Sequence, residues 1–146
     1  MTTSSNPMGS SFKTTIERYC AHFNWQVAEA TEEYAKLQFT MESQRRQTVY
    51  ILRYESTLEF DVPSMAAFDS EEQIPHQLST ILLKRSAQRK VGFWCIEEIG
   101  GKHVYSYMHN VELRLHDIEY FGMVVRSLIT EVDDFEGILL KMLNDD

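Results

Sequence analysis

Hydrophobic residues recur at steps of three and four between Asp117 and Leu143. The stripe consists of Ile118, Gly122, Val125, Ile129, Val132, Phe135 and Leu139. This spacing places the side chains on one face of a helix, and the stripe is wide enough to need a partner surface. The opposite side is mostly polar and carries Glu119, Arg126, Glu131, Asp133 and Glu136. We therefore predict a long closing helix with one buried and one solvated face.

A shorter helix is predicted near the beginning of the chain, from a cap at Ser11 to about Phe23. Its apolar face consists of Phe12, Ile16, Tyr19, Cys20 and Phe23. Asn24 is expected to end it. The preceding residues 1–10 are polar and include helix breakers, so we predict that they form a disordered leader.

Beyond the first helix the hydrophobic period changes to two, which is typical of strands. Strands are predicted at Trp25 to Ala30, Tyr34 to Met41 and Thr48 to Tyr54. A further extended segment covers Thr57 to Val62, where Pro63 is expected to stop it. The short polar turns between these segments indicate an antiparallel meander.

The second half of the chain predicts one more helix and a hairpin. The helix begins at Ser70 or, because proline is tolerated only in a first turn, at Pro75, and it ends near Gln88. Two strand-like runs follow, and Gly100-Gly101 between them is a strong signal for a two-residue hairpin turn.

The predicted element order is α-β-β-β-α-β-β-α, with the segment after Tyr54 as a possible fourth strand. Strands that do not alternate strictly with helices favour an α+β fold. We predict an antiparallel β-sheet of five or six strands packed by helices on one face. The length of 146 residues, of which 43% are hydrophobic, suits a single domain over residues 11–146.

The formal net charge of -8 argues against nucleic acid as a partner, because such binding depends on cations that neutralise phosphates. The basic cluster Lys84, Arg85, Arg89 and Lys90 is an exception that could contact an anion. The simpler interpretation is the solvated C-terminal end of a helix, where cations complement the helix dipole.

The two cysteines, Cys20 and Cys95, are far apart and form no Cys-x-x-Cys pair. This pattern favours reduced thiols in a cytoplasmic protein over a disulfide framework. The N-terminus lacks the features of a secretory signal, and no run of about 18 apolar residues predicts a membrane span.

Candidate chemistry in the sequence is weak. His103 and His109 lie about 20 Å apart if they share a strand, which is too far for one metal ion. The apolar neighbours of Cys95 should raise the pKa of its thiol and reduce its reactivity. The carboxylate pairs Glu97-Glu98 and Asp133-Asp134 are interpreted as solvated. We therefore expect no catalytic residue, no metal and no cofactor.

Several landmarks make the chain similar to the YbjN family over residues 12–143. They are the strand end at Val62-Pro63, a helix with the run Leu78 to Leu83, the link Lys90 to Trp94, the glycine hairpin that reaches Val111, and the long closing helix. The chain departs from the family at Ser86 to Arg89, where many members have an asparagine at the helix end.

This resemblance implies a fold like that of type III secretion chaperones, in a small acidic cytoplasmic protein that is often dimeric. Chaperones of this fold wrap extended client segments around hydrophobic surface patches. The resemblance supplies no reaction and no functional residue to transfer.

Aromatic residues crowd the predicted strands, and an uncovered apolar sheet face usually marks a partner surface. The candidate interaction residues are Leu78, Leu82, Phe93, Trp94, Tyr105 and Tyr107. In this hypothesis the glycine hairpin and the preceding helix form a homodimer interface. The alternative is an exposed sheet face that simply carries tyrosines.

We therefore predict a non-enzymatic protein-binding module, a chaperone or an assembly or regulatory adaptor, that forms a homodimer and binds an unidentified protein client. The competing hypothesis is a small-molecule-binding protein or enzyme with a pocket between the sheet and the closing helix. Such a site needs convergent polar groups in an apolar cleft, and no such group stands out in the sequence.

Overall fold

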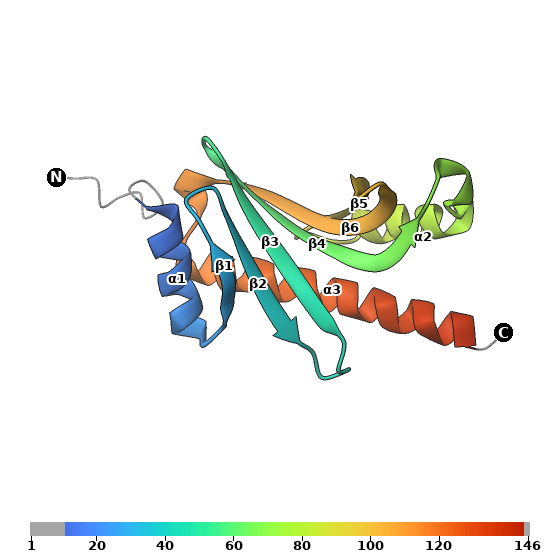
Figure 1. Ribbon diagram of the computed structural model, residues 1–146, viewed down its shortest axis with the longest axis horizontal. Coiled ribbons are helices and arrows are strands. Elements are labelled where there is room, and N and C mark those ends of the chain that lie inside the picture. The colour runs from blue at the N-terminus through green and yellow to red at the C-terminus, as the bar shows by residue number, and fades with distance from the viewer. Residues whose placement is uncertain (1–10, 145–146) are drawn as a thin grey trace.

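The structure, a computed structural model, describes residues 11–144 (Figure 1). Within them one antiparallel sheet has the strand order β1-β2-β3-β4-β6-β5. The strands are β1 Val27–Ala30, β2 Tyr34–Thr40, β3 Arg46–Tyr54, β4 Thr57–Phe68, β5 Phe93–Ile99 and β6 Lys102–Glu112. The α-helices are α1 Phe12–Phe23, α2 His76–Ala87 and α3 Ile118–Asn144.

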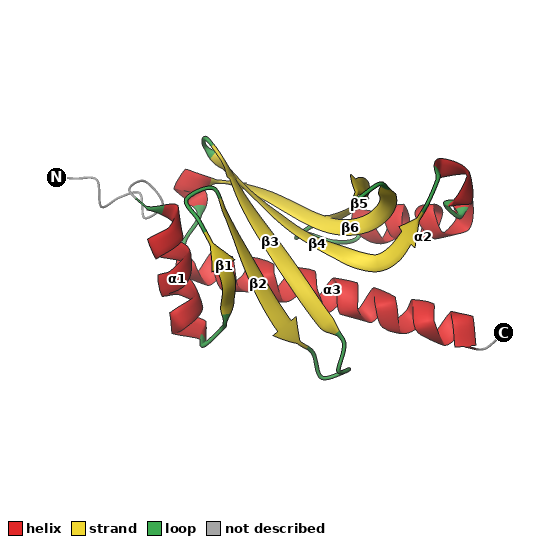
Figure 2. Ribbon diagram, viewed as in Figure 1, coloured by secondary structure: helices red, strands yellow, loops and turns green. Residues whose placement is uncertain are grey.

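The element order over the described residues is α-β-β-β-β-α-β-β-α, which confirms the predicted α+β class and includes the fourth strand. Figure 2 shows that short loops join the strands of the first meander. The predicted leader, residues 1–10, lies outside the described residues, and the assignment of residues 11–146 to a single domain stays a prediction. None of the described helices is long and apolar enough to cross a membrane.

Both ends of α1 have the predicted caps. The Ser11 hydroxyl accepts a hydrogen bond from the Thr14 N–H at 3.1 Å. Asn24 ends the helix with φ at 61°, the left-handed conformation that asparagine tolerates better than most residues. The side chain of Tyr19 then packs on Phe121 of α3, with ring centroids 5.3 Å apart.

The prediction that Pro63 stops a strand is wrong, because β4 continues to Phe68. β4 pairs with β3 only from Thr57 to Asp61, which lies opposite Tyr50. Pro63 lies beyond this paired segment, so its missing N–H removes no hydrogen bond to β3. Pairing with β6 continues past the proline after a register shift between Pro63 and Ala67. Within the irregular segment, the N–H of Met65 donates instead to Glu136 Oε2 at 2.8 Å.

The glycine hairpin is confirmed. Gly100 and Gly101 join β5 to β6 with φ angles of 58° and 80°, as a two-residue turn of this kind requires. The helix before it starts at His76, directly after Pro75, and the Ser70 side chain makes no capping hydrogen bond. Of the two predicted starts, the one at the proline is therefore confirmed.

The buried face of α3 covers the sheet where β3, β4 and β6 lie side by side (Figure 1). Val125, Leu128 and Val132 are fully buried, and Phe121 packs on Phe60 of β4 with ring centroids 6.0 Å apart. The predicted apolar stripe is therefore the central layer of the core.

The prediction of a solvated opposite face on α3 is wrong for Glu131, Asp133 and Glu136, which are all buried. Asp133 accepts hydrogen bonds from the Arg45 guanidinium and the Gln47 amide, at 3.1 and 3.2 Å. The same amide donates to Glu136 at 2.7 Å. Side chains of the β2–β3 turn and of β3 thus supply the donors that allow these carboxylates to leave water.

Candidate functional site

Glu131 of α3 joins the elements that the sequence marked as an interaction region. Arg85 of α2 donates from Nε and Nη2 to its two oxygens, both at 2.8 Å. Arg89 donates to Oε1 at 3.0 and 3.2 Å, and the indole N–H of Trp94 donates to Oε2 at 2.9 Å. Burial alone would raise the pKa of Glu131, but the hydrogen bonds from Arg85, Trp94 and Arg89 outweigh it and lower that pKa.

This arrangement corrects the interpretation of the basic cluster as a solvated helix end. Arg85 and Arg89 are directed at one buried carboxylate, so they hold the C-terminal end of α2 against α3. The bidentate geometry of Arg85 is the strong form of such a pair. Lys84 and Lys90 remain exposed.

The link between α2 and β5 is fixed by further hydrogen bonds. The N–H of Trp94 donates to the Ser86 hydroxyl at 2.7 Å, and the Tyr107 hydroxyl donates to the Val91 carbonyl at 2.7 Å. The Trp94 ring packs on Tyr107 and Phe135, with centroids 5.1 and 4.9 Å away. These contacts place the first residues of β5 at a defined position beside α2.

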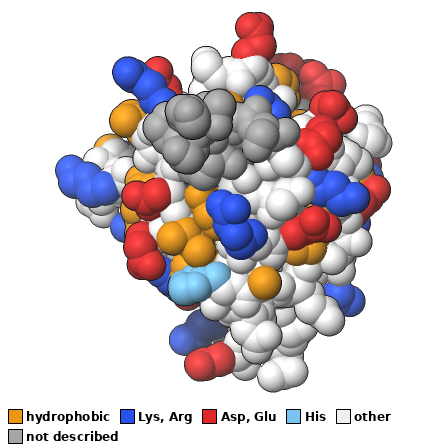
Figure 3. Space-filling model, turned by 90° about the vertical axis from the view of Figure 1, so that its left-hand side faces the viewer, with side chains coloured by type: hydrophobic (Ala, Val, Ile, Leu, Met, Phe, Trp, Pro, Cys, Tyr) orange, Lys and Arg blue, Asp and Glu red, His pale blue; other side chains and the backbone are white. Residues whose placement is uncertain are grey.

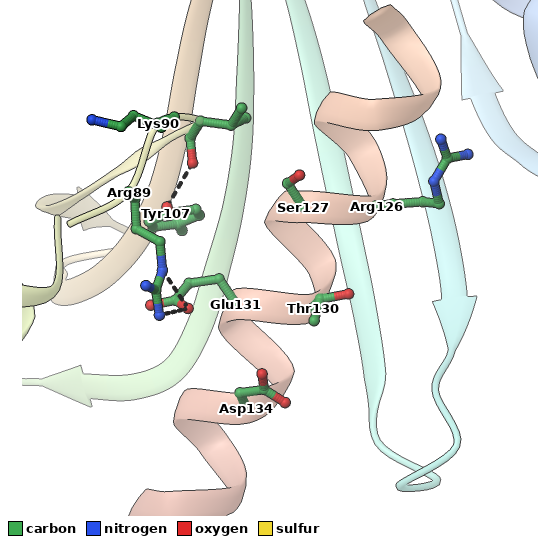
Figure 4. A pocket seen from close by; sticks show the side chains of 9 residues that line it. Arg89, Lys90, Tyr107, Arg126, Ser127, Thr130, Glu131 and Asp134 are labelled. Atoms are coloured by element: carbon green, nitrogen blue, oxygen red, sulfur yellow. Dashed lines mark hydrogen bonds and ion pairs between the residues drawn. The ribbon is translucent and has the colours of Figure 1, made fainter. Parts of the chain in front are cut away.

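A hollow of about 540 Å³ opens between this link and α3 (Figure 4). Its lining comprises Arg89, Lys90, Val91, Tyr107, Arg126, Ser127, Thr130, Glu131 and Asp134. Figure 4 shows Arg89 directed at Glu131, whereas Lys90 and Arg126 extend away from it. The guanidinium of Arg126 instead lies over the Phe23 ring, 5.4 Å from its centroid. Arg89 thus pairs with Glu131, and the three cations of the lining do not converge on one point.

The outer side of α2 and β5 is apolar. Leu83 is 64% exposed, and a small groove of about 170 Å³ between the two elements has Leu82, Trp94 and Tyr105 in its lining. The large hydrophobic side chains exposed on α2 and β5 are Ile81, Leu83, Phe93, Ile96 and Ile99, which we call the apolar flank. On β5, Ile96 points to the side of α2, whereas Phe93 and Ile99 point to the opposite face of this edge strand. β5 is an edge strand of the described sheet, so one side of its backbone has no strand partner there.

The structure places the predicted interaction residues close together, but mostly inside the chain. Leu82, Trp94, Tyr105 and Tyr107 are at most 3% exposed, and Leu78 is half-buried. Phe93 is 40% exposed. Local sequence patterns did not indicate that Ile81, Leu83 and Ile96 are exposed beside these residues. Nor did they indicate that Glu131 joins α3 to Arg85, Arg89 and Trp94.

The groups weighed for chemistry have structural environments. Burial raises the pKa of both cysteine thiols to about 12, which makes Cys20 and Cys95 poor nucleophiles at neutral pH. His109 lies between the Gly92 N–H, from which its Nδ1 accepts, and the Tyr120 hydroxyl, 2.7 Å from its Nε2. In the part of the chain that the structure describes, no group of three or more His, Cys, Asp or Glu side chains is arranged to hold a metal ion.

No protein-family model matches the chain, and no curated protein matches it either. Among solved structures, a chain of the HopA1–SchA chaperone–effector complex is similar, with a TM-score of 0.60 and 9% sequence identity. The match covers 92% of this chain and 97% of that one. YbjN from E. coli, described as a candidate transcription regulator, is similar over 82% of this chain and 84% of its own, with a TM-score of 0.57 and 10% identity. The fold is therefore YbjN-like and similar to that of a secretion chaperone, as predicted.

Proposed function

We propose that this chain is a non-enzymatic protein-binding module, a chaperone or an assembly or regulatory adaptor, that acts in the cytoplasm and also associates with itself. The fold supports the proposal, because it is similar to a chain from a chaperone–effector complex and to a candidate regulator. The two free thiols are compatible with a reducing compartment.

The observation that carries the proposal is the apolar flank beside a free strand edge. Its side chains are 40% to 64% exposed, and each contributes about 1 kcal/mol if a partner covers it. The unpaired edge of β5 offers backbone donors and acceptors in the same place. An extended segment that adds to such an edge gains main-chain hydrogen bonds, while side-chain pockets supply specificity.

The buried positions of Trp94 and Tyr105 change which side chains make the proposed contact. Trp94 lies in the floor of the groove. Its truncation would open a cavity and remove the hydrogen bond that its indole N–H donates to Glu131. The contact itself is assigned to Leu83, Ile96 and Phe93 of the apolar flank. The proposed dimer interface therefore stays at the hairpin and α2 but uses their outer side chains.

The test replaces Leu83 with glutamate and compares the result with Leu115→Glu. Leu115 is 63% exposed and lies between β6 and α3, so it controls for the loss of one exposed leucine. Light scattering should give the mass of two chains for the wild type and for Leu115→Glu, and a lower mass for Leu83→Glu. Affinity pull-down from native cytosol should likewise recover a stoichiometric protein companion with the first two proteins only.

A wild-type protein with the mass of one chain and no stoichiometric companion would contradict the proposal. So would equal binding by Leu83→Glu and the wild type when circular dichroism shows both to be folded. Figure 3 views the molecule from the left-hand side of Figure 1, where acidic and basic side chains are interspersed around a small hydrophobic group.

The second candidate function is that of a small-molecule-binding protein or enzyme. The observation that favours it is the hollow between α3 and the link from α2 to β5. A thermal-shift panel of metabolites and metals tests it, because a ligand that binds only the folded state raises Tm. Specific stabilisation by one ligand, lost in Lys90→Ala, would favour this function over the protein-binding module.

A further inference from the structure

Acidic side chains gather on the sheet face that lies away from the helices. Trp94, Tyr105 and Tyr107 pack toward α2 and α3, so the alternate residues of β5 and β6 point to the opposite face. Those residues include Glu97 of β5 and Ser106 of β6. The register of β4 with β6 places Asp61 opposite Met108 and thus on the same face.

Two carboxylate oxygens and a hydroxyl in this group are buried without hydrogen-bond partners. Asp61 is 7% exposed and Ser106 is fully buried. Asp61 Oδ1, Glu97 Oε1 and Ser106 Oγ have no hydrogen-bond partner within the described residues. Each unsatisfied buried polar group costs about 1–3 kcal/mol, so this face holds polar groups that a ligand can stabilise.

The charged groups that act on Asp61 are acidic. Burial is the largest cause that raises the pKa of Asp61 to about 8, followed by the nearby Glu97 carboxyl and by the charge of Glu59. Burial and the charge of Glu97 also raise the pKa of Glu59. Lys36, a cation on the same face, lies over the Tyr50 ring at 5.9 Å and is not among the groups that act on Asp61.

We propose that Asp61 and Glu97, together with the Ser106 hydroxyl, bind one arginine or lysine side chain of a polypeptide segment that lies across this face of the sheet. The inference rests on the proposed protein-binding function and specifies a chemical feature of the partner. The incoming cation replaces the proton that Asp61 retains, and the Ser106 hydroxyl oxygen accepts a further hydrogen bond from it.

Apolar groups beside the pair suit the rest of such a side chain. On β5, Phe93 and Ile99 point to the same face as Glu97 and are 40% and 42% exposed. Arginine and lysine pack their aliphatic stems on apolar surface while their charged ends reach polar partners. The partner segment is therefore expected to carry a basic residue flanked by hydrophobic ones.

The experiment uses two capped peptides that differ at one position. One carries a single arginine between leucines, and the other carries citrulline, which has nearly the same shape without the charge. NMR follows the Asp61 carboxyl and the amides of β4, β5 and β6 during titration at millimolar peptide. The arginine peptide should lower the pH at which Asp61 titrates by at least one unit and should bind about tenfold or more tightly than the citrulline peptide.

Charge-removing variants locate the effect. Asp61→Asn and Glu97→Gln keep side-chain size and should abolish the preference for arginine, whereas Glu98→Gln, the next residue on the other face of β5, should retain it. Equal binding of the two peptides, or no change in Asp61 titration with either, would overturn the proposal. A free polyamine that shifts Asp61 more than the peptide does would overturn the assignment to a polypeptide.

The two proposals fail separately. If Leu83→Glu loses its protein companion while the peptides show no preference for arginine, the protein-binding function stands and the cation site is wrong. If the arginine preference is found but the wild type has no companion and no self-association, the cation site is real and the proposed function is wrong.

Discussion

Replacement of Glu131 by glutamine tests whether this carboxylate holds α2 and β5 on α3. The substitution preserves the size of the side chain. It removes the negative charge of a carboxylate that accepts hydrogen bonds from two guanidinium groups. Glutamine retains one acceptor oxygen instead of two, and its amide places N–H donors where Arg85, Arg89 and Trp94 now find an acceptor. The guanidinium groups then lie beside a donor instead of an acceptor.

The expected loss of stability follows from the exposure of the partners. Removal of one member of a fully buried ion pair costs about 3–5 kcal/mol. The side chain of Glu131 is 6% exposed, but those of Arg85 and Arg89 are 26% and 36% exposed and can regain some water. We therefore expect Glu131→Gln to reduce the free energy of unfolding by about 2–3 kcal/mol, which for a chain of this size lowers Tm by roughly 6–10 °C.

Urea unfolding monitored by tryptophan fluorescence is the assay, because Trp94 donates directly to Glu131. Asp134→Asn, which removes an exposed carboxylate one turn further along α3, is the matched control and should change the free energy of unfolding by less than about 0.5 kcal/mol. A change of that small size in Glu131→Gln itself would refute the reasoning.

The pH dependence has a definite sign. The pKa of Glu131 is lower in the folded state than in the unfolded chain, where a glutamate has a pKa of about 4.3. The ionised side chain therefore stabilises the fold at pH values above about 4.3. That contribution is lost as the pH falls through the folded value. The difference in the free energy of unfolding between wild type and Glu131→Gln should therefore become smaller below about pH 4.

Three further predictions concern single residues. Gly92 has φ at +90°, and an added Cβ would lie 2.4 Å from the Tyr107 ring, so Gly92→Ala should lower the free energy of unfolding in urea by about 2–4 kcal/mol. Because the pKa of Asp61 is raised to about 8, wild-type stability should fall as pH rises from about 4 to 8, and Asp61→Asn should lose this decline in thermal scans. Burial lowers the pKa of His116 to about 4, so the free energy of unfolding of the wild type should decrease as pH falls from about 6.5. Between pH 7 and pH 5 the free energy of unfolding of His116→Phe should therefore rise by about 2 kcal/mol relative to that of wild type.

Each of these has its own control. Gly101→Ala adds a Cβ in open space at φ +80°, so it should cost only about 1–2 kcal/mol, and an equal cost at both glycines would contradict the clash with Tyr107. Parallel pH profiles for Asp61→Asn and wild type would contradict proton retention by Asp61. If the stability of His116→Phe falls between pH 7 and pH 5 as much as that of wild type, a group other than His116 causes the decrease.

The sequence predicts the elements of the fold well because their patterns are local. The caps at Ser11 and Asn24 and the turn at Gly100-Gly101 each depend on residues within a few positions. The extent of β4 was mispredicted because the effect of Pro63 depends on where the β3 ladder ends, and that is set by pairing with a distant segment.

The candidate site was harder to predict because its polar contacts are long-range. Glu131 reaches Arg85 across 46 positions, and Gln47 reaches Asp133 across 86, so neither pair leaves a trace in local periodicity. Glu97, interpreted as solvated, has one buried oxygen beside Asp61 of another strand.

The inward and outward faces of β5 also lacked a local signal. Phe93, Trp94, Cys95 and Ile96 are all apolar, so alternation does not show which of them point to the core. The structure resolves this through Trp94, whose indole reaches the buried Glu131, and thereby places Phe93 on the opposite face.

The position of α3 after every strand has a consequence for biosynthesis. The hydrophobic face of the sheet, including Phe60, stays uncovered on the ribosome until the residues of α3 have left the exit tunnel. The nascent chain therefore presents a sheet-forming, aggregation-prone surface until α3 has emerged and can pack on it. A protein that binds other polypeptides through apolar surface would then itself depend on general chaperones before its last helix is made.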